Sequence, residues 1–319
     1  MAIPLLLILL LDIYLRNMNS MYKEKYEDAL AKADSIQVLV LGNSHACYAV
    51  NPAAFSYYTF NLANVSQSLY FDKRITQSLL PELPKLKYVF ISIDYHSLYF
   101  SSQKFRDYWS YYGNGIKYKD KSYFLAQLSP TLFGYTPKVA IAMVWKRIAN
   151  RLKYGKNSID FDIEKGVDMK GKLIKGFIPF QGVNKQLMND LNYQNRAAEF
   201  ARTIYSSNEK QEIVSDLKGF IELLQQKDIT PVLFSSPTYG KYNLFLNDSI
   251  INQNKITINK LCETYNIKYW DYSNSQYFDE GDFFNCDHMN AKGAFRFSTK
   301  LNDSILYLAN THKLSINRD

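Results

Sequence analysis

Cysteine, proline and glycine are scarce in this chain of 319 residues, which has three Cys, 9 Pro and 13 Gly. The cysteines form no CxxC pair, so the sequence predicts neither a disulfide framework nor a thiolate metal site. The apolar share of 47% is typical of a packed globule and excludes a low-complexity or disordered chain. A glycine-rich phosphate loop and a cluster of His and carboxylate residues are also missing, so we expect no cofactor and no metal ion.

Patterns that mark nucleic-acid binding are absent as well. The sequence has no C2H2 spacing, no RNP-like aromatic string and no basic helix of the kind that enters a groove. The formal net charge of +8 and the pI near 9.0 favour anionic partners in general without selecting one. We therefore expect no nucleic-acid partner.

No apolar run is long enough for a complete membrane span. The longest, at residues 2–15, reads AIPLLLILLLDIYL, whereas a span needs about 20 residues. A signal peptide is not indicated, because no basic n-region precedes the run and no small-residue cleavage site follows it. We interpret residues 1–19 as an uncleaved membrane anchor whose upstream part is missing; a buried or interfacial apolar helix is the alternative.

The basic residues near this run bear on its orientation. Arg16, Lys23 and Lys25 all follow the run, so the positive-inside rule applied to them alone would leave the body of the chain in the cytoplasm. Basic residues upstream of Met1 would remove that conflict.

The body of the chain has an α/β pattern. Residues 20–34 are polar and are expected to form a helix or stalk. Short apolar runs then alternate with amphipathic helical stretches, which predicts a parallel sheet covered by helices on both faces, that is, a three-layer α/β/α fold. The expected strands are residues 36–41, 57–62, 88–94, 230–235 and 267–270.

One domain is expected to span residues 35–311, followed by a polar tail at 312–319. The alternation breaks between about 101 and 205, where Tyr, Lys and Gly are frequent. We interpret this stretch as an insertion over one end of the sheet, with helices near residues 138–152 and 184–201. A ligand of such a sheet binds at the carboxyl ends of its strands.

The sharpest local motif is LGNSHACYAVNP at residues 41–52. Ser44 follows the first buried strand and begins a helix, where its hydroxyl projects from the sheet edge and its amide faces a developing oxyanion. Ser44 is therefore a candidate nucleophile, although a helix N-cap would have the same pattern. The turn differs from a nucleophile elbow of the α/β-hydrolase type because only one strand has formed before it.

A serine nucleophile needs a general base. Among the four histidines, His45 adjoins Ser44 and is expected to point away from its hydroxyl, and His312 lies in the tail. His288 lies in the loop motif FFNCDHMNAKGAFRFS, which leads into the last amphipathic helix. This loop can deliver the imidazole to the sheet edge that carries Ser44.

Together, GNSH and DHMNAKGAFRFS resemble the first and last motif blocks of the SGNH (GDSL-like) hydrolase superfamily. The resemblance is to its membrane-anchored cell-envelope branch, related to the lipoteichoic-acid D-alanylation and alginate O-acetylation proteins. It also covers NLANVSQS and TPVLFSSP but not the insertion. It implies an SGNH or flavodoxin-like α/β/α fold, with Ser44 as nucleophile and His288 as base.

Several positions depart from the family pattern. The acidic residue that usually lies three positions before the base is Asn285 here, and Asp287 is the one carboxylate in that motif. Either Asn285 or a backbone carbonyl fixes the imidazole, or Asp287 substitutes, or activity has been lost.

The residues of the expected oxyanion pocket also depart from the family pattern. It comprises Asn43, Ala63, Asn64 and Asp94. Ala63 replaces a glycine whose amide stabilises the oxyanion, and a backbone donor survives that change. Asp94 replaces an asparagine, and a carboxylate repels an oxyanion.

The resemblance implies acyl transfer through Ser44, by an esterase or O-acyltransferase acting on a cell-surface polysaccharide or envelope polymer. It also implies a membrane-bound O-acyltransferase partner and a location on the extracytoplasmic face of a bacterial envelope. The alternative is a catalytically inactive, membrane-tethered binding or scaffolding subunit that keeps the fold.

Overall fold

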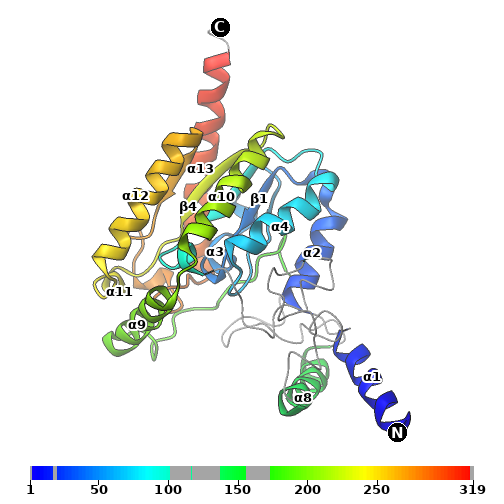
Figure 1. The fold of residues 1–319 in the computed structure, drawn as a ribbon. Coiled ribbons are helices and arrows are strands. Elements are labelled where there is room, and N and C mark those ends of the chain that lie inside the picture. Colours follow the sequence, from blue (N-terminus) through cyan, green and yellow to red (C-terminus); the bar gives the residue numbers. More distant parts are fainter. Residues whose placement is uncertain (1, 17–19, 101–115, 117–136, 156–172, 317–319) are drawn as a thin grey trace.

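The computed structural model describes residues 2–16, 20–100, 116, 137–155 and 173–316 (Figure 1). Five parallel strands form one sheet in the order β2-β1-β3-β4-β5, which is the flavodoxin-like order. All five expected strands are present, so the predicted three-layer α/β/α fold is confirmed. The strands are β1 (Val38–Leu41), β2 (Thr59–Asn61), β3 (Tyr88–Ser92), β4 (Thr230–Ser235) and β5 (Lys268–Asp271).

Helices precede, connect and cover these strands. Those before β4 are α1 (Ala2–Arg16), α2 (Met21–Ala31), α3 (Ser44–Ala49), α4 (Leu69–Leu79), α8 (Pro137–Tyr154), α9 (Asp190–Ser206) and α10 (Lys210–Gln225). Those after it are α11 (Gly240–Asn243), α12 (Asp248–Tyr265) and α13 (Ala291–Ile316).

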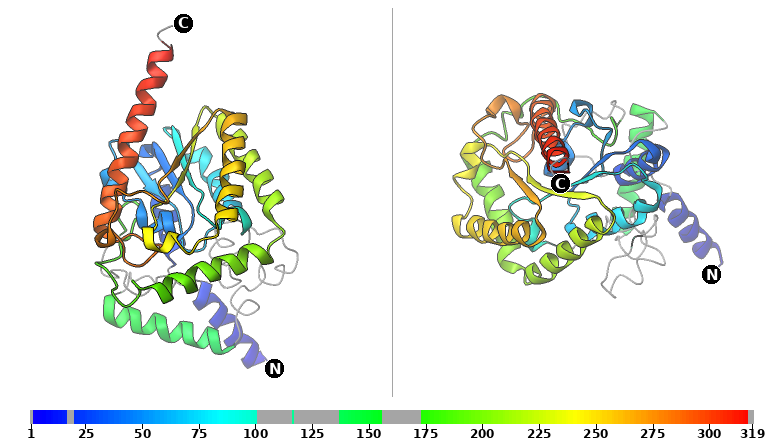
Figure 2. Two further views of the ribbon diagram at one scale, coloured as in Figure 1. Left: turned by 90° about the vertical axis from the view of Figure 1, so that its left-hand side faces the viewer. Right: turned by 90° about the horizontal axis from the view of Figure 1, so that it is seen from above.

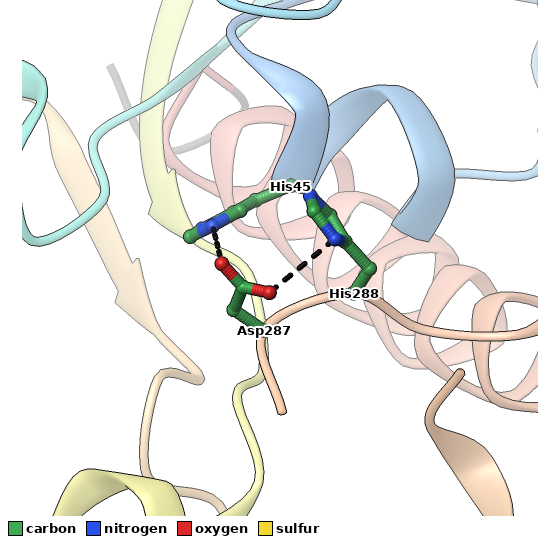
Figure 3. Close-up of side chains that lie close together, drawn as sticks. All are labelled: His45, Asp287 and His288. Carbon is green, nitrogen blue, oxygen red and sulfur yellow. Dashed lines mark ion pairs between the residues drawn. The ribbon is translucent and has the colours of Figure 1, made fainter. Parts of the chain in front are cut away.

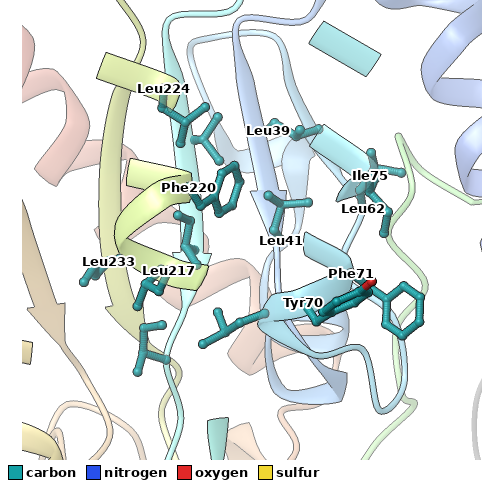
Figure 4. Packing of buried hydrophobic residues seen from close by; sticks show 14 of the residues in the cluster. Leu39, Leu41, Leu62, Tyr70, Phe71, Ile75, Leu217, Phe220, Leu224 and Leu233 are labelled. Atoms are coloured by element: carbon teal, nitrogen blue, oxygen red, sulfur yellow. The ribbon is translucent and has the colours of Figure 1, made fainter. Parts of the chain in front are cut away.

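The sheet separates two hydrophobic cores because side chains alternate along each strand. In β1, Leu39 and Leu41 enter the core shared with α2, α4, α10 and α12, part of which Figure 4 shows. Val38 and Val40 point to the other face, where α3 and α13 pack. The second view in Figure 2 shows α13 on one side of the sheet and α10 and α12 on the other. All four residues of β1 are buried, as expected for an interior strand.

Helix α2 lies within residues 20–34, where the sequence predicts a polar helix or stalk, and one face of it is buried in the domain. Its Met21, Tyr22 and Ala29 are fully or almost fully buried against the two cores. Lys25 is also completely buried and donates hydrogen bonds to the carbonyl oxygen of Ala63 and the sulfur of Cys47. The other charged residues of the helix are partly or fully exposed, so the segment looks polar in sequence although one face of it packs against the cores.

The described part of the insertion lies at the carboxyl edge of the sheet. Both of its predicted helices are present, as α8 and α9, whereas residues 101–115, 117–136 and 156–172 lie outside the described residues. Helices α1 and α8 lie side by side below this edge (Figures 1 and 2). Among the described residues, no helix combines the length and the apolar character that crossing a membrane requires.

A glycine allows the insertion to pass close to the edge strand β2. Gly176 has φ +82°, and a Cβ atom there would lie 2.0 Å from the carbonyl oxygen of Asn61. The backbone amide of Asn61 donates a hydrogen bond to the carbonyl oxygen of Lys175 at 2.9 Å, so the insertion covers part of the open edge of β2. The side chain of Asn61 in turn binds the carbonyl oxygens of Ala46 and Val50 and thereby holds α3.

We expect Gly176→Ala to destabilise the fold more than Gly182→Ala does. Both glycines have positive φ, which costs an alanine about 1 kcal/mol, but a Cβ at Gly182 meets nothing within 4 Å. Chemical denaturation of both variants measures the difference, with roughly 1 kcal/mol or more of extra loss at Gly176. Equal losses would mean that the close approach to Asn61 does not exist.

Candidate active site

Ser44 lies at a tight turn between β1 and α3. The turn requires Gly42, which has φ +136° and whose Cβ would lie 2.4 Å from the Cβ of Ser92. Asn43 caps α3 by accepting a hydrogen bond from the His45 amide at 2.9 Å. Ser44 is the first residue of the helix, so its N–H has no acceptor within α3. Its side chain is largely buried but reaches the surface, with 8% of the residue exposed.

The loop before α13 delivers His288 to this turn. An antiparallel bridge between Phe283 and Met289 closes the loop, and the Phe284 amide donates to the carbonyl oxygen of His288 at 2.9 Å. The ring of Tyr48 packs edge-on against the imidazole, with 5.4 Å between the centroids. These contacts fix the imidazole in a pocket where only 2% of His288 is exposed.

The two expected catalytic groups meet, although 244 residues separate them in the sequence. The Nε2 atom of His288 lies 2.9 Å from the Oγ atom of Ser44. On the opposite side of the ring, Nδ1 lies 3.3 Å from Oδ1 of Asp287. The contact between Nδ1 and Asp287 is at ion-pair distance rather than a hydrogen bond, and Nε2 is the ring nitrogen directed at the Ser44 hydroxyl.

Asn285 occupies the position of the usual acidic residue, but its side-chain oxygen binds the backbone of the loop. Its Oδ1 accepts hydrogen bonds from the amides of Asp287 and His288, at 3.2 and 2.8 Å. This leaves its Nδ2, which can only donate, 3.2 Å from Nδ1 of His288. Asn285 therefore shapes the loop but cannot accept the Nδ1 proton of a histidine that acts as base. Asp287 lies 3.3 Å from the same Nδ1, so both residues considered from the sequence flank this nitrogen.

Asp287 is held by two further groups. Its Oδ2 accepts a hydrogen bond from Nε of Arg196 at 2.6 Å and lies 3.4 Å from Nε2 of His45. Burial alone raises the pKa of this carboxyl group, but its cationic neighbours, Arg196 first, lower it well below its usual value. Asp287 is therefore ionised despite being almost completely buried.

His45 lies between two buried carboxylates. Its Nε2 faces Asp287, and its Nδ1 lies 3.5 Å from Oδ1 of Asp94. Figure 3 shows the Asp287 side chain between the rings of His45 and His288, with one oxygen directed at each. Burial lowers the pKa of His45, but the two carboxylates raise it by more, to about 9. His45 is therefore an imidazolium at neutral pH, held between two carboxylates.

Asp94 is a partner of His45 and not an oxyanion donor. Its Oδ2 accepts from the hydroxyl of Ser92 at 2.8 Å, and its Oδ1 accepts from the amide of Ser236 at 3.3 Å. Burial raises the pKa of Asp94, but His45 first, with His96 and the Ser92 hydroxyl, lowers it by more, so the net shift is downward. Burial and the adjacent charge of His45 lower the pKa of His96 to about 3, so only one of these two imidazoles is charged.

The expected oxyanion pocket needs correction at Ala63. Its amide, predicted as a donor to the oxyanion, donates instead to Oδ1 of Asn61 at 3.0 Å. The backbone amide of Asn64 donates to Gly42 at 3.0 Å, while its side chain is buried with Oδ1 accepting from Val65.

The side-chain nitrogen of Asn43 also has a partner within the site and lies 3.3 Å from Nε2 of His96. Of the expected pocket residues, Asn64 therefore keeps a side-chain nitrogen without an acceptor among the described residues.

Three of these side chains have the composition of a metal site. Ligand atoms of His45, Asp287 and His288 lie within 4.8 Å of one another. Arg196, however, already donates to the same carboxylate at 2.6 Å, and a divalent cation there would face the guanidinium charge. The cluster is explained by the ionic contacts of its own residues, and we assign no metal to it.

Sequence reasoning missed Arg196 and the position of His45. Arg196 lies on α9 within the insertion, far from any recognised motif, and its guanidinium also pairs with Glu199 at 2.9 Å. No local pattern indicates that α9 crosses above the His288 loop. For His45 a signal exists, because a histidine at the second position of a short buried helix cannot be solvated.

The comparisons with known proteins add a fold similarity. No protein-family model and no curated protein matches the sequence. Among solved structures, a Bacteroides fragilis protein described as a "putative acylhydrolase" matches with a TM-score of 0.40 and 11% identity, over 89% of this chain and 95% of that chain. A similarity at this level assigns no activity.

The charged state of His45 predicts a pH dependence of stability. The pKa of His45 is raised from 6.5 to about 9 in the folded state, so protonated His45 stabilises the fold fully below pH 6.5. This stabilisation is lost as the pH rises through about 9. We expect the free energy of unfolding to fall over this interval by up to roughly 1.4 kcal/mol per pH unit.

In His45→Gln this slope should disappear, whereas His312→Gln, at the far end of α13, should keep it. Denaturation at several pH values measures both. A His45→Gln protein with the wild-type slope would show that His45 is neutral in the folded state.

Proposed function

We propose that this protein is a serine acyl-transfer enzyme of the SGNH (GDSL-like) type, in its cell-envelope branch. The observation that carries the proposal is the 2.9 Å contact between the Ser44 hydroxyl and Nε2 of His288, with Asp287 on the far side of the imidazole. This arrangement is the geometry required of a nucleophile, a base and an orienting carboxylate.

The reaction proceeds through an acyl-enzyme. Oγ of Ser44 attacks the ester carbonyl carbon of the donor while its proton passes to Nε2 of His288, and Asp287 stabilises the imidazolium that forms. The tetrahedral intermediate collapses, and the leaving alcohol takes that proton. Water or an acceptor hydroxyl then attacks the acyl-Ser44 ester with His288 again as base, so hydrolysis and transfer differ only in the acceptor.

The oxyanion of that intermediate requires donors other than Ala63. The N–H of Ser44 has no acceptor within α3, and Nδ2 of Asn64 has none among the described residues. We assign the oxyanion to these two groups. Asp94 supplies no donor, and its charge is compensated by His45, 3.5 Å away.

A large cavity supports a saccharide as acceptor. It has a volume of about 820 Å³ and lies at the carboxyl ends of β4 and β5, with His45, the neighbour of Ser44, and Asp94 in its wall, while Ser44 and His288 lie outside its lining. Two of its lining residues, Ser236 and Asn254, have buried oxygen atoms without a hydrogen-bond partner among the described residues. Amide and tyrosine side chains are among its other lining residues, and these groups suit the hydroxyls and ring faces of sugars. They include Tyr239, Asn243, Asn252, Tyr269, Asn274 and Gln276.

The acceptor polymer and the location follow from the family resemblance. We infer an envelope polysaccharide or acylated polymer as substrate, with the protein attached to the membrane through residues 1–19 on the extracytoplasmic face. A membrane-bound O-acyltransferase would supply the acyl group. The exposed leucines and isoleucines of α1 support the membrane attachment.

An active-site serine probe tests the proposed chemistry. We expect a fluorophosphonate to label the wild-type protein and Ser56→Ala, a substitution at an exposed serine, but not Ser44→Ala. Intact-protein mass spectrometry measures the label. A folded wild-type protein that takes up no label would instead favour the inactive scaffolding subunit.

The loop carboxylates should differ in their effect on this labelling. Asp287→Asn removes the acceptor of the Nδ1 proton, so we expect the labelling rate to fall roughly 10²-fold or more. Asn285→Asp places a carboxylate 3 residues before the base, as in the family pattern, and should keep the rate within about tenfold of wild type. Circular dichroism verifies that both variants are folded. The opposite ranking would make residue 285 the orienting group.

A further inference from the structure

Helix α8 exposes an apolar stripe. Ile141, Trp145, Ile148 and Leu152 recur at intervals of four, three and four residues, which places them on one face of the helix. Their exposed fractions are 53%, 67%, 39% and 85%. Exposed apolar side chains occur singly on most proteins, but a continuous stripe with a tryptophan marks an interaction surface.

The charges of α8 indicate what this surface meets. The helix contains five basic residues and no acidic residue. Helical geometry places the exposed Lys146 and Lys153 to one side of the apolar stripe, whereas Arg147, on the other side, is buried against α1. A helix with an apolar face, flanking lysines and an interfacial tryptophan has the composition of one that lies in the headgroup region of an anionic bilayer.

Helix α1 extends the apolar surface. Arg147 donates a hydrogen bond to the carbonyl oxygen of Tyr14 at 2.8 Å, and its guanidinium lies 4.4 Å from the centre of the Tyr14 ring. Further along α1, Leu6, Leu7 and Leu10 are all more than half exposed. The two helices therefore form one surface, which we call the α1–α8 surface.

This surface lies on the side of the molecule that bears the site. Figures 1 and 2 show α1 and α8 beyond the carboxyl ends of the strands, at the end opposite the C-terminus. The turn that carries Ser44 follows β1 at this same edge. A bilayer in contact with the α1–α8 surface would therefore face the catalytic edge of the sheet.

We propose that the α1–α8 surface docks on an anionic lipid bilayer, with α8 lying in the headgroup region and the catalytic edge facing the lipid. The partner is the bilayer and not another protein, because the exposed Lys146 and Lys153 beside the apolar stripe complement anionic headgroups and α8 has no acidic residue. Under the proposed function, on which this consequence rests, an acyl donor reaches Ser44 from the membrane.

Vesicles test this docking with the full chain. We expect binding to phosphatidylcholine vesicles containing phosphatidylglycerol to be stronger than binding to phosphatidylcholine alone, and to weaken with salt. The double substitution Trp145→Gln, Leu152→Gln should weaken binding to the anionic vesicles about tenfold or more. Ile256→Gln, at a residue of α12 that is 70% exposed, serves as the matched control and should bind as the wild type does.

Tryptophan fluorescence tests whether a lipid bilayer, and not a second copy of the chain, binds the apolar stripe. Brominated lipids should quench an emission component that is absent from Trp145→Phe. If the double variant binds as wild type does, or if Trp145 escapes quenching, α8 does not enter the bilayer and the proposal is wrong. Self-association that depends on Trp145 and Leu152 in the absence of vesicles would assign the stripe to a second copy of the chain and would also overturn the proposal.

Fluorophosphonate labelling of the double variant in detergent should equal that of wild type, so failure of docking is distinguishable from failure of the acyl-transfer proposal.

Discussion

A chain of buried ionic contacts organises the site. It begins at Asp94, passes through the imidazolium of His45 to Asp287, and ends at His288 and Ser44. Each carboxylate is almost fully buried, and a buried charge is tolerated only when it is paired. Arg196 first, and His288 and His45 with it, lower the pKa of Asp287, so this carboxylate remains ionised next to His288.

The fold places this chain of contacts at the carboxyl edge of the sheet. Ser44, Asp94 and Ser236 each follow the end of a neighbouring strand, so the order β1-β3-β4 brings them together. The loop before α13 adds Asp287, and α9 adds Arg196. Because Arg196 comes from the insertion, that insertion is part of the site and not merely a cover for it.

The sequence was sufficient for the sheet and for the meeting of Ser44 with His288, because strand and helix periodicities and the parallel-sheet rule are local signals. It was insufficient for Arg196, whose contact with Asp287 spans 91 residues and depends on where α9 crosses the sheet edge. The sequence prediction that the Ala63 amide donates to the oxyanion failed for a similar reason, because it too depends on a side-chain contact. Its amide is captured by Asn61, a side chain whose direction no periodicity predicts.

The protonation state of His45 tests this account most directly. Nitrogen NMR of the histidine rings, with His45 assigned by its loss in His45→Gln, reports whether each ring nitrogen carries a proton. We predict that both ring nitrogens of His45 are protonated at pH 7 and that the ring loses a proton only near pH 9. A neutral His45 ring at pH 7 would contradict the account, because Asp94 and Asp287 would then lack the charge that binds them together.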